Sequence, residues 1–307
     1  MKDIWIDLLC YRRHGHNESD EPKFTQPMLY NKIAKHANPR EVYWKKLTEA
    51  GDFSPDLSAE LDKQFRKQLQ DRLNEVKQNP LPYKPQKIEE EWKQLSHSKP
   101  KDFEKSPNTA ITEEAVELVG NALTKLPEGF KPLKQIDKLI KDRKANFFEK
   151  KELNWADGEL LAYGSLLNED KIVRMSGQDV KRGTFSHRHS YVFDANTNEA
   201  YSNLDYIKEG QNQHFRIFNS LLSEFGVLGF EYGFAMATPN ALVVWEAQFG
   251  DFANGAQVMS DEFIASAESK WQRMNGLVML LHHGYEGQGP EHSNARPERF
   301  LQLAAED

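Results

Sequence analysis

The sequence predicts an α/β protein in which residues 151–307 form a parallel, doubly wound sheet. In this half, short runs rich in Val, Ile and Leu alternate with longer stretches of helical spacing, the pattern of parallel strands joined by helical crossovers. One apolar run, residues 277–281, is followed at once by histidines and glycines. Ligands bind outside the carboxyl ends of the strands in open α/β sheets, so this run indicates a functional edge.

Four strands and three helices are predicted in this half, in the chain order helix 159–167, strand 172–175, strand 216–218, helix 221–237, strand 242–245, helix from about 252 to 270, and buried strand 277–281. Between the first two strands, Asn196-Thr197-Asn198 predicts the turn of a hairpin, because asparagine side chains hydrogen-bond to nearby backbone.

The first 150 residues have a different character. Residues 1–29 hold an apolar run, Ile4–Leu9, that predicts a strand, and then a polar loop. Residues 30–150 are rich in Lys, Glu and Gln and predict amphipathic helices and linkers on the surface of a core. One helix spans Leu57 to Val76, and another begins at Thr112. A buried parallel strand needs neighbours on both sides, so we expect the chain to be a piece of a longer protein.

Composition narrows the possible functions. The net charge of −7 argues against a general nucleic-acid or anionic-membrane binder. The single cysteine, Cys10, excludes an internal disulfide and suits a reducing compartment. Because it lies in an apolar run, we expect it to be a buried, inert thiol. The sequence contains neither an apolar stretch of membrane-spanning length nor an N-terminal signal peptide.

Glu224 is the first candidate for chemistry. We expect it in the first turn of the helix over 221–237, after Asn219 or Ser220 as the cap, where the helix dipole favours a carboxylate. A plain structural role is therefore available. Apolar neighbours would also partly desolvate this carboxyl group, which would let it hold and pass on a proton near neutral pH.

Three glycines follow in the same helix and are unfavourable there. Together Gly226, Gly229 and Gly233 cost roughly 2–3 kcal/mol of helix propensity relative to alanine. We therefore expect another helix or a ligand to approach this helix closely.

Further candidates lie after the other strands. Phe249 and Phe252 are either core aromatics or rings that cover a flat heterocycle. The loop over 177–189 is dense in hydrogen-bond donors and is either a carboxylate or phosphate site or a polar domain interface. The passage Gly276–Phe300 is either a solvated loop or part of a ligand site; its polar and glycine residues are His282, His283, Gly284, Gly287, Gly289, Glu291, His292, Arg296 and Arg299.

Metal and nucleotide motifs are weak. His14 and His16 flank Gly15 beside several acidic residues, but neither this pair nor His283 with His292 has the spacing of a zinc protease. The sequence has no Walker motif and no Gly-x-Gly-x-x-Gly after a strand.

Four long motifs, in order, closely resemble the thiamine-diphosphate-dependent dehydrogenase (decarboxylating) component of the 2-oxoglutarate dehydrogenase complex. They are DLLCYRRHGHNESDEPKFTQP, GQDVKRGTFSHRH, NSLLSEFGVLGFEYGFAMATPNALVVWEAQFGDFANGAQ and HGYEGQGPEHSNARPERFLQL. The resemblance implies that residues 151–307 are a pyrimidine-binding, transketolase-like domain, truncated at its end. It also implies that residues 30–150 are a helical linker region and that residues 1–29 carry the last strand of a diphosphate-binding domain.

The same resemblance implies the cofactor-binding residues. Glu224 would contact and protonate the ring nitrogen of the aminopyrimidine of thiamine diphosphate. Phe249 and Phe252 would pack on the pyrimidine, and Gln178 would contact cofactor or substrate.

Three histidines are implied as further catalytic residues. His292 and His283 would lie near the reacting centre as proton donors or substrate contacts, and His16 would reach the cofactor from the diphosphate-binding domain. The sequence departs from the family at His282, where the family usually has proline. It also lacks the Gly-Asp-Gly…Asn-Asn segment that holds Mg²⁺ and the diphosphate, so we expect no metal site in this chain.

By resemblance, the parent protein decarboxylates 2-oxoglutarate and transfers the succinyl unit to a lipoyl group of the succinyltransferase component. It would do so as a homodimer, in a bacterial cytoplasm or a mitochondrial matrix, without nucleic-acid or membrane partners. We expect the isolated chain to be inactive. Two alternatives stay open: a related thiamine enzyme for another 2-oxo acid, such as pyruvate or 2-oxoadipate, and a non-catalytic dimerisation or assembly piece.

Overall fold

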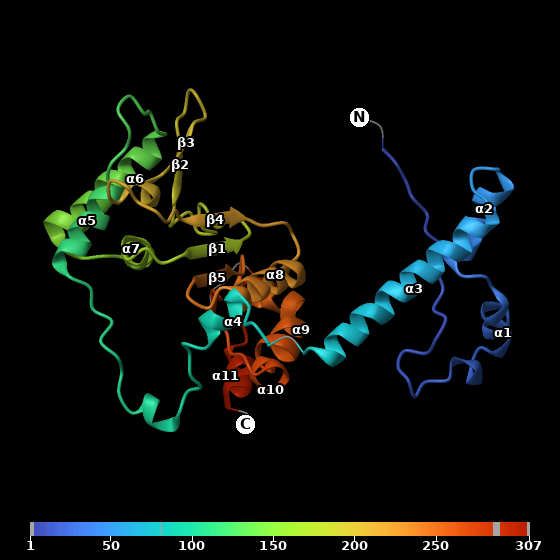
Figure 1. The fold of residues 1–307 in the computed structure, drawn as a ribbon. Coiled ribbons are helices and arrows are strands. Elements are labelled where there is room, and N and C mark those ends of the chain that lie inside the picture. Colours follow the sequence, from blue (N-terminus) through green and yellow to red (C-terminus); the bar gives the residue numbers. More distant parts are fainter. Residues whose placement is uncertain (1–2, 81, 285–288, 306–307) are drawn as a thin grey trace. The chain divides into compact units, whose positions relative to one another are not determined.

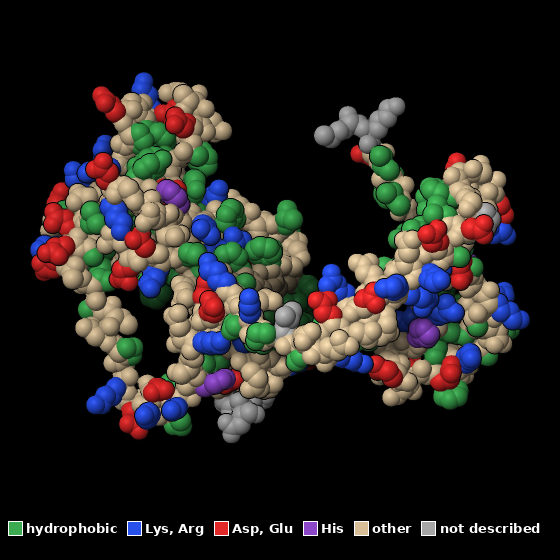
Figure 2. All heavy atoms as spheres, viewed as in Figure 1, with side chains coloured by type: hydrophobic (Ala, Val, Ile, Leu, Met, Phe, Trp, Pro, Cys, Tyr) green, Lys and Arg blue, Asp and Glu red, His purple; other side chains and the backbone are tan. Residues whose placement is uncertain are grey.

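The computed structural model describes residues 3–80, 82–284 and 289–305 (Figure 1). The chain separates into two compact units, residues 1–84 and 85–307. On the face shown in Figure 2, Lys and Arg side chains are interspersed with Asp and Glu side chains. Among the described residues, no helix combines the length and the apolar character needed to cross a membrane.

The first unit begins with open backbone. The prediction of a strand over Ile4–Leu9 is wrong for this structure: the run has no regular secondary structure, and Trp5 and Leu9 are each 95% exposed. A strand needs a neighbour for its backbone hydrogen bonds, and no described residue pairs with this run. Cys10 is likewise exposed, so the expected buried thiol is also wrong.

Helices make up the rest of the first unit. They are a 3₁₀ helix, η1 (Pro22–Phe24), and the α-helices α1 (Pro27–Lys35), α2 (Pro39–Glu49) and α3 (Pro55–Gln78). Asn38 caps α2 in a capping box with Glu41. Helix α3 confirms the helix predicted over Leu57–Val76. The expected packing of this helix on a core is wrong, because its apolar side chains are exposed, namely Leu61, Phe65, Leu69, Leu73 and Val76.

The second unit opens with helices that lead to the sheet. They are α4 (Lys87–Trp92), η2 (Pro100–Phe103), α5 (Glu113–Leu123), α6 (Lys134–Ala145), the π-helical turn η3 (Asn146–Lys150) and α7 (Trp155–Asn168). The helix start predicted at Thr112 is confirmed, since its Oγ1 accepts a hydrogen bond from the Ala115 N–H at 3.2 Å. The Trp92 ring N–H donates to the Met236 carbonyl at 2.9 Å.

The predicted parallel α/β sheet is confirmed. Four strands lie in the order β4-β1-β5-β6, and every neighbouring pair is parallel. The strands are β1 (Val173–Gly177), β4 (Arg216–Asn219), β5 (Leu242–Glu246) and β6 (Leu277–Leu280). The hairpin is confirmed as well: β2 (Tyr191–Phe193) pairs antiparallel with β3 (Ala200–Ser202). In its turn, the Asp194 carboxylate accepts hydrogen bonds from the backbone N–H groups of Asn196 and Thr197.

Helices cover both faces of the four-stranded sheet. One core cluster joins α5 and α7 to β1, β4 and β5 through residues such as Val119, Leu160 and Met175. The other joins α8 (Glu224–Ala237) and α9 (Gln257–Met259) to β5 through Leu228, Met259 and Trp245. This arrangement makes the sheet doubly wound.

Three element predictions need correction. Helix α8 begins at Glu224 with Ser223 as its cap, because the Asn219 side chain accepts a hydrogen bond from the Lys181 N–H instead. The helix expected from about 252 to 270 is divided, since Asn254 and Gly255 disfavour a regular helix; its pieces are η5 (Gly250–Ala256), α9, the π turn η6 (Ser260–Ile264) and α10 (Ala267–Trp271). Strand β6 is half-exposed because it lies at the sheet edge.

Gly177, the last residue of β1, allows β1 to lie very close to the end of β5 at the functional edge. Its φ is +154°, and a Cβ atom there would lie 2.2 Å from the Glu246 carbonyl oxygen. We predict that Gly177→Ala lowers the free energy of unfolding of the chain by about 2–4 kcal/mol, measured by urea denaturation. Gly233→Ala is the matched control, since nothing lies within 4 Å of its Cβ position. Equal stability of the two variants would contradict this account of Gly177.

Candidate active site

The candidate site lies at the carboxyl edge of the sheet. Because the four strands are parallel, the ends of β1, β4, β5 and β6 lie along one edge. The first residues after the four strands are Gln178, Ser220, Ala247 and Leu281. Every candidate residue of the second unit is one of these or lies in the segment that follows one of them.

Glu224 and Gln178, which the family resemblance implied as cofactor contacts, line one small cavity. Ser220, Val227 and Gln248 also line it. Gln248 was not singled out from the sequence. It lies two residues after the end of β5, and this position beyond a strand end was the signal that could have identified it.

The Glu224 carboxylate is held by its helix. Ser223 Oγ accepts a hydrogen bond from the Gly226 N–H at 3.2 Å, so Glu224 occupies the first position of α8, where the helix dipole stabilises its charge. Its side chain is half-buried. Of the apolar neighbours expected to shield it, Leu228 is fully buried, whereas Leu222 is 77% exposed.

The glycines of α8 have different surroundings. At Gly229 the expected close approach is confirmed, because a Cβ atom would lie 3.2 Å from Met259 Sδ. At Gly233 a Cβ atom would meet nothing within 4 Å. An apolar groove runs along this side of the helix, lined by Gly229, Tyr232, Gly233, Met236, Met259, Phe263, Trp271 and Arg273.

Phe249, Phe252 and His292 form a compact ring cluster. The His292 ring centroid lies 4.7 Å from that of Phe249 and 5.3 Å from that of Phe252, in both cases edge to face. The two phenylalanine centroids are 5.9 Å apart. His292 Nδ1 lies 3.4 Å from a carboxylate oxygen of Glu291. The structure therefore brings three of the predicted residues together as one wall.

A second ring cluster extends this wall and was not predicted. Phe185 contacts Phe249 at 5.9 Å and His282 at 5.0 Å, both edge to face, and the His187 ring lies 6.2 Å from each of Phe185 and His282. The sequence signals were the Ser-His-Arg-His block and the paired histidines after β6. Their contact depends on the fold and could not be read from spacing.

His283 lies on the exposed loop after β6. Its Nδ1 accepts a hydrogen bond from the Ala295 N–H at 3.2 Å, and the Gly284 N–H donates to the Ser293 carbonyl at 2.9 Å. These bonds hold the loop against the segment that follows His292. Gly287, the middle glycine of this predicted loop, lies outside the described residues.

Arg188 is the principal donor of the loop over 177–189, and it is fully buried. Its guanidinium forms a two-pronged pair with the buried Glu246 carboxylate at 2.6 and 3.0 Å. It also donates to Glu159 of α7 at 2.5 Å and to the Val180 carbonyl at 2.8 Å. Because these acceptors occupy it, Arg188 is a structural cation rather than a ligand-binding one.

Charge and burial shift two pKa values at this edge. Burial alone would raise the pKa of the Glu246 carboxyl group, but the neighbouring His282 ring and Arg188 guanidinium outweigh it and hold the pKa at about 2. Burial, reinforced by Arg188, lowers the pKa of His187, which favours the neutral ring.

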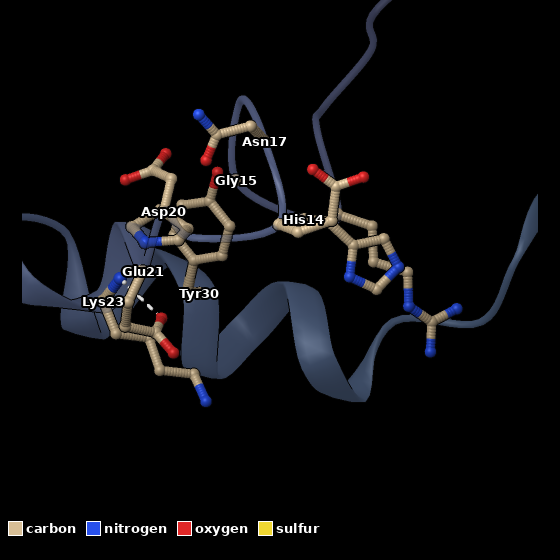
Figure 3. Close-up of a pocket in the computed structure, with 10 residues that line it drawn as sticks. His14, Gly15, Asn17, Asp20, Glu21, Lys23 and Tyr30 are labelled. Atoms are coloured by element: carbon tan, nitrogen blue, oxygen red, sulfur yellow. Dashed lines mark hydrogen bonds between the residues drawn. The ribbon is translucent and has the colours of Figure 1, made fainter.

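His16 belongs to the first unit. Its Nδ1 lies 3.0 Å from Asp20 Oδ2, and the hydrogen bond to His16 lowers the pKa of Asp20. The same turn borders a hollow of polar side chains that include His14, Asn17 and Tyr30 (Figure 3). Across the described residues, no three His, Cys, Asp or Glu side chains are arranged to hold a metal ion.

Comparison with known families identifies the class of this fold and site. Residues 151–306 match the family model described as transketolase, pyrimidine binding domain, and the chain belongs to this family. Residues 1–84 match the model described as dehydrogenase E1 component.

Individual relatives are more specific. Over all 307 residues, the chain is 45% identical to the mitochondrial 2-oxoglutarate dehydrogenase of Caenorhabditis elegans, of which it covers 29%. It is also 45% identical to the 2-oxoglutarate dehydrogenase E1 components of Brucella anthropi and Brucella ovis, covering 30% of each. The chain thus spans less than a third of the length of these curated relatives.

The Glu246 carboxyl group makes the free energy of unfolding depend on pH. Its pKa is 4.5 in a model compound and about 2 in the fold, so its stabilising effect is complete above about pH 4.5 and is lost as the pH falls toward 2. The free energy of unfolding falls by about 3 kcal/mol when this effect is lost. We predict that Glu246→Gln flattens the dependence of unfolding free energy on pH between about 5 and 2, measured by urea denaturation. An unchanged slope would contradict the assignment.

Proposed function

We propose that this chain supplies the pyrimidine side of a thiamine-diphosphate site in a 2-oxoglutarate dehydrogenase that decarboxylates its substrate. The observation that carries the proposal is the meeting of Glu224 and Gln178 in one cavity at the carboxyl edge of the sheet. The names of the relatives support 2-oxoglutarate as the substrate and do not favour another 2-oxo acid.

The side-chain types present suit an aminopyrimidine ring, which would need more room than the roughly 10 Å³ of this cavity. Such a ring needs an acid at its nitrogen, amide partners at its polar edge and apolar cover on its faces. Glu224 would be the acid, with Gln178 and Gln248 as amide partners. Phe249 and Phe252 would give the apolar cover. Gly255 lies beside the carboxylate, since a Cβ atom there would make an ordinary contact with Glu224 Oε2 at 3.5 Å.

The residues of the chain would bind, orient and move protons. When bound, thiamine diphosphate supplies a carbon nucleophile that attacks the keto carbon and accepts the electrons released with carbon dioxide. Glu224 would hold the proton at the ring nitrogen. His292, which packs edge to face against two phenyl rings, and His283 would donate protons at the substrate. By the family resemblance, His16 would reach the cofactor from the diphosphate-binding domain.

Several partners follow from the proposal. They are 2-oxoglutarate, the lipoyl-bearing succinyltransferase component and a second copy of the parent in a homodimer. Mg²⁺ would be held with the diphosphate by a segment outside this chain. The compartment would be a bacterial cytoplasm or a mitochondrial matrix, because the relatives include enzymes of both kinds.

The second candidate function is assembly without catalysis. The apolar groove along α8 favours it, because Gly233 leaves space there and Trp271 is 43% exposed. Exposed apolar surface of this kind marks an interaction site. In this case the glycines of α8 would serve a dimer interface rather than the cofactor.

Replacement of Glu224 separates the two candidates. In the full-length parent, we predict that Glu224→Gln lowers decarboxylation of 2-oxoglutarate at least about a hundred-fold, because the amide cannot pass a proton, while the dimer stays intact. Activity is measured with thiamine diphosphate and Mg²⁺, and dimerisation by analytical ultracentrifugation. Glu262→Gln, at a carboxylate that is 67% exposed, is the control. Loss of the dimer in the Glu224 variant would support the assembly function instead.

The isolated chain gives a further test. We predict no turnover of 2-oxoglutarate by residues 1–307 alone, even with thiamine diphosphate and Mg²⁺, because the motif that binds the diphosphate is missing from this sequence. Product formation is measured by carbon dioxide release, with the full-length parent as positive control. Turnover by the isolated chain would overturn this expectation.

A further inference from the structure

His282 lies where three parts of the functional edge meet. Its side chain is 27% exposed, and its Nε2 atom is shielded from solvent. This nitrogen lies 3.3 Å from Glu246 Oε1 at the end of β5 but lacks hydrogen-bond geometry to any described group. The His282 ring also packs edge to face against Phe185, from the loop after β1, with 5.0 Å between the ring centroids.

The buried charges around His282 do not balance without it. Arg188 carries one positive charge, and its partners Glu246 and Glu159 carry two negative charges. One net negative charge therefore remains in a shielded place, which is unfavourable. The nearby His187 does not offset it, because burial and Arg188 favour its neutral form. A protonated His282 ring would make this group of charges neutral.

The backbone of His282 holds the wall of the site directly. Its carbonyl oxygen accepts a hydrogen bond from the Gly250 N–H at 3.0 Å. A Cβ atom at Gly250 would lie only 2.3 Å from that oxygen, so the two segments are in close contact. Phe249 precedes Gly250 and contacts both His292 and Phe185. The carbonyl of His282 thus holds the residue next to Phe249, and its ring reaches Phe249 through Phe185.

We infer that His282 is a positioning residue: its protonated ring pairs with Glu246 and thereby holds the Phe249–His292 wall in place for the reaction. The inference rests on the proposed function for its kinetic readout. The groups around the ring are ionised Glu246, the Arg188 and Glu159 charges behind it and neutral His187. Since Glu246 stays ionised, the pairing requires a positive charge on the side chain at position 282.

The test compares His282→Gln with His282→Lys in the full-length parent across pH. Glutamine removes the positive charge, whereas lysine keeps it over the whole range. We expect His282→Gln to lower kcat about three- to ten-fold near pH 6 and to approach the wild type near pH 9. We expect His282→Lys to restore kcat near pH 6. The same pattern is expected in the thermal unfolding midpoint, which needs no turnover.

A matched control is His97→Gln. His97 also pairs with a carboxylate, at 2.6 Å from Glu268, but its side chain is 58% exposed and it belongs to the segment after α4. We expect its kcat to match the wild type at both pH values. The inference is overturned if His282→Gln lowers kcat by the same factor at every pH, or has no effect. It is also overturned if His282→Lys gives no recovery.

The two proposals fail in different ways. If Glu224→Gln retains full activity, the proposed function is wrong, and the unfolding midpoints alone then test the pairing of His282. If Glu224→Gln abolishes turnover but His282→Gln leaves the pH profile unchanged, only the positioning inference is wrong.

Discussion

The buried pair of Arg188 and Glu246 holds together the functional edge of this protein. The guanidinium reaches Glu246 at the end of β5, Glu159 on α7 and the Val180 carbonyl after β1, so one side chain ties three elements. Both partners are shielded from water, and the loss of either would leave the other as an uncompensated buried charge. The wall residues Phe185 and His187 lie three and one residues before Arg188, and Gln248 and Phe249 lie two and three residues after Glu246. The pair therefore sets the positions of both sides of the site.

A second buried ion pair holds the helix that carries Glu224. Arg174 of β1 forms two hydrogen bonds with Glu231 of α8, at 2.7 and 2.9 Å. Its guanidinium also lies against three aromatic rings at 4.8 to 5.1 Å from their centroids, namely Phe218, Phe230 and Phe234. Cation–π contacts of this kind favour a charge that is partly removed from water. The position of Glu224 thus depends on a contact two turns further along its own helix.

The sequence predicted the sheet well because hydrophobic periodicity reports local backbone structure. Prediction from the sequence failed where a contact with a distant residue, or the absence of one, decides the local structure. Ile4–Leu9 has the composition of a strand, yet no described residue offers it hydrogen bonds. Helix α8 begins late because the Asn219 side chain is engaged by the Lys181 N–H, 38 residues away in sequence.

The candidate site was predictable to the extent that its residues follow strand ends. Phe249 could be singled out in this way, whereas Glu224 was singled out by its place in a helix and Gln178 by the family resemblance. The structure brings Glu224 and Gln178 to one cavity at this edge. The contacts of Phe185 and His187 with His282 join segments nearly a hundred residues apart, so neither period nor spacing could reveal them. The role of His16 stays a prediction, because it belongs to the other unit.

The charges at this edge favour proton transfer over anion binding. The cationic side chains of the loop after β1 all have partners within the fold: Arg188 is held by two carboxylates, Arg182 lies 3.4 Å from Asp179, and Lys181 lies 4.3 Å from the centre of the Tyr191 ring. The remaining groups are a carboxylate at the start of α8 and histidines set among phenyl rings. A carboxylate and imidazoles are the side chains that the proposed proton transfers need, whereas a phosphate needs free cations or a row of backbone donors. The donor-rich loop is thus better explained as internal structure, and the carboxylate and imidazoles of this edge support the proton-handling role that we propose for it.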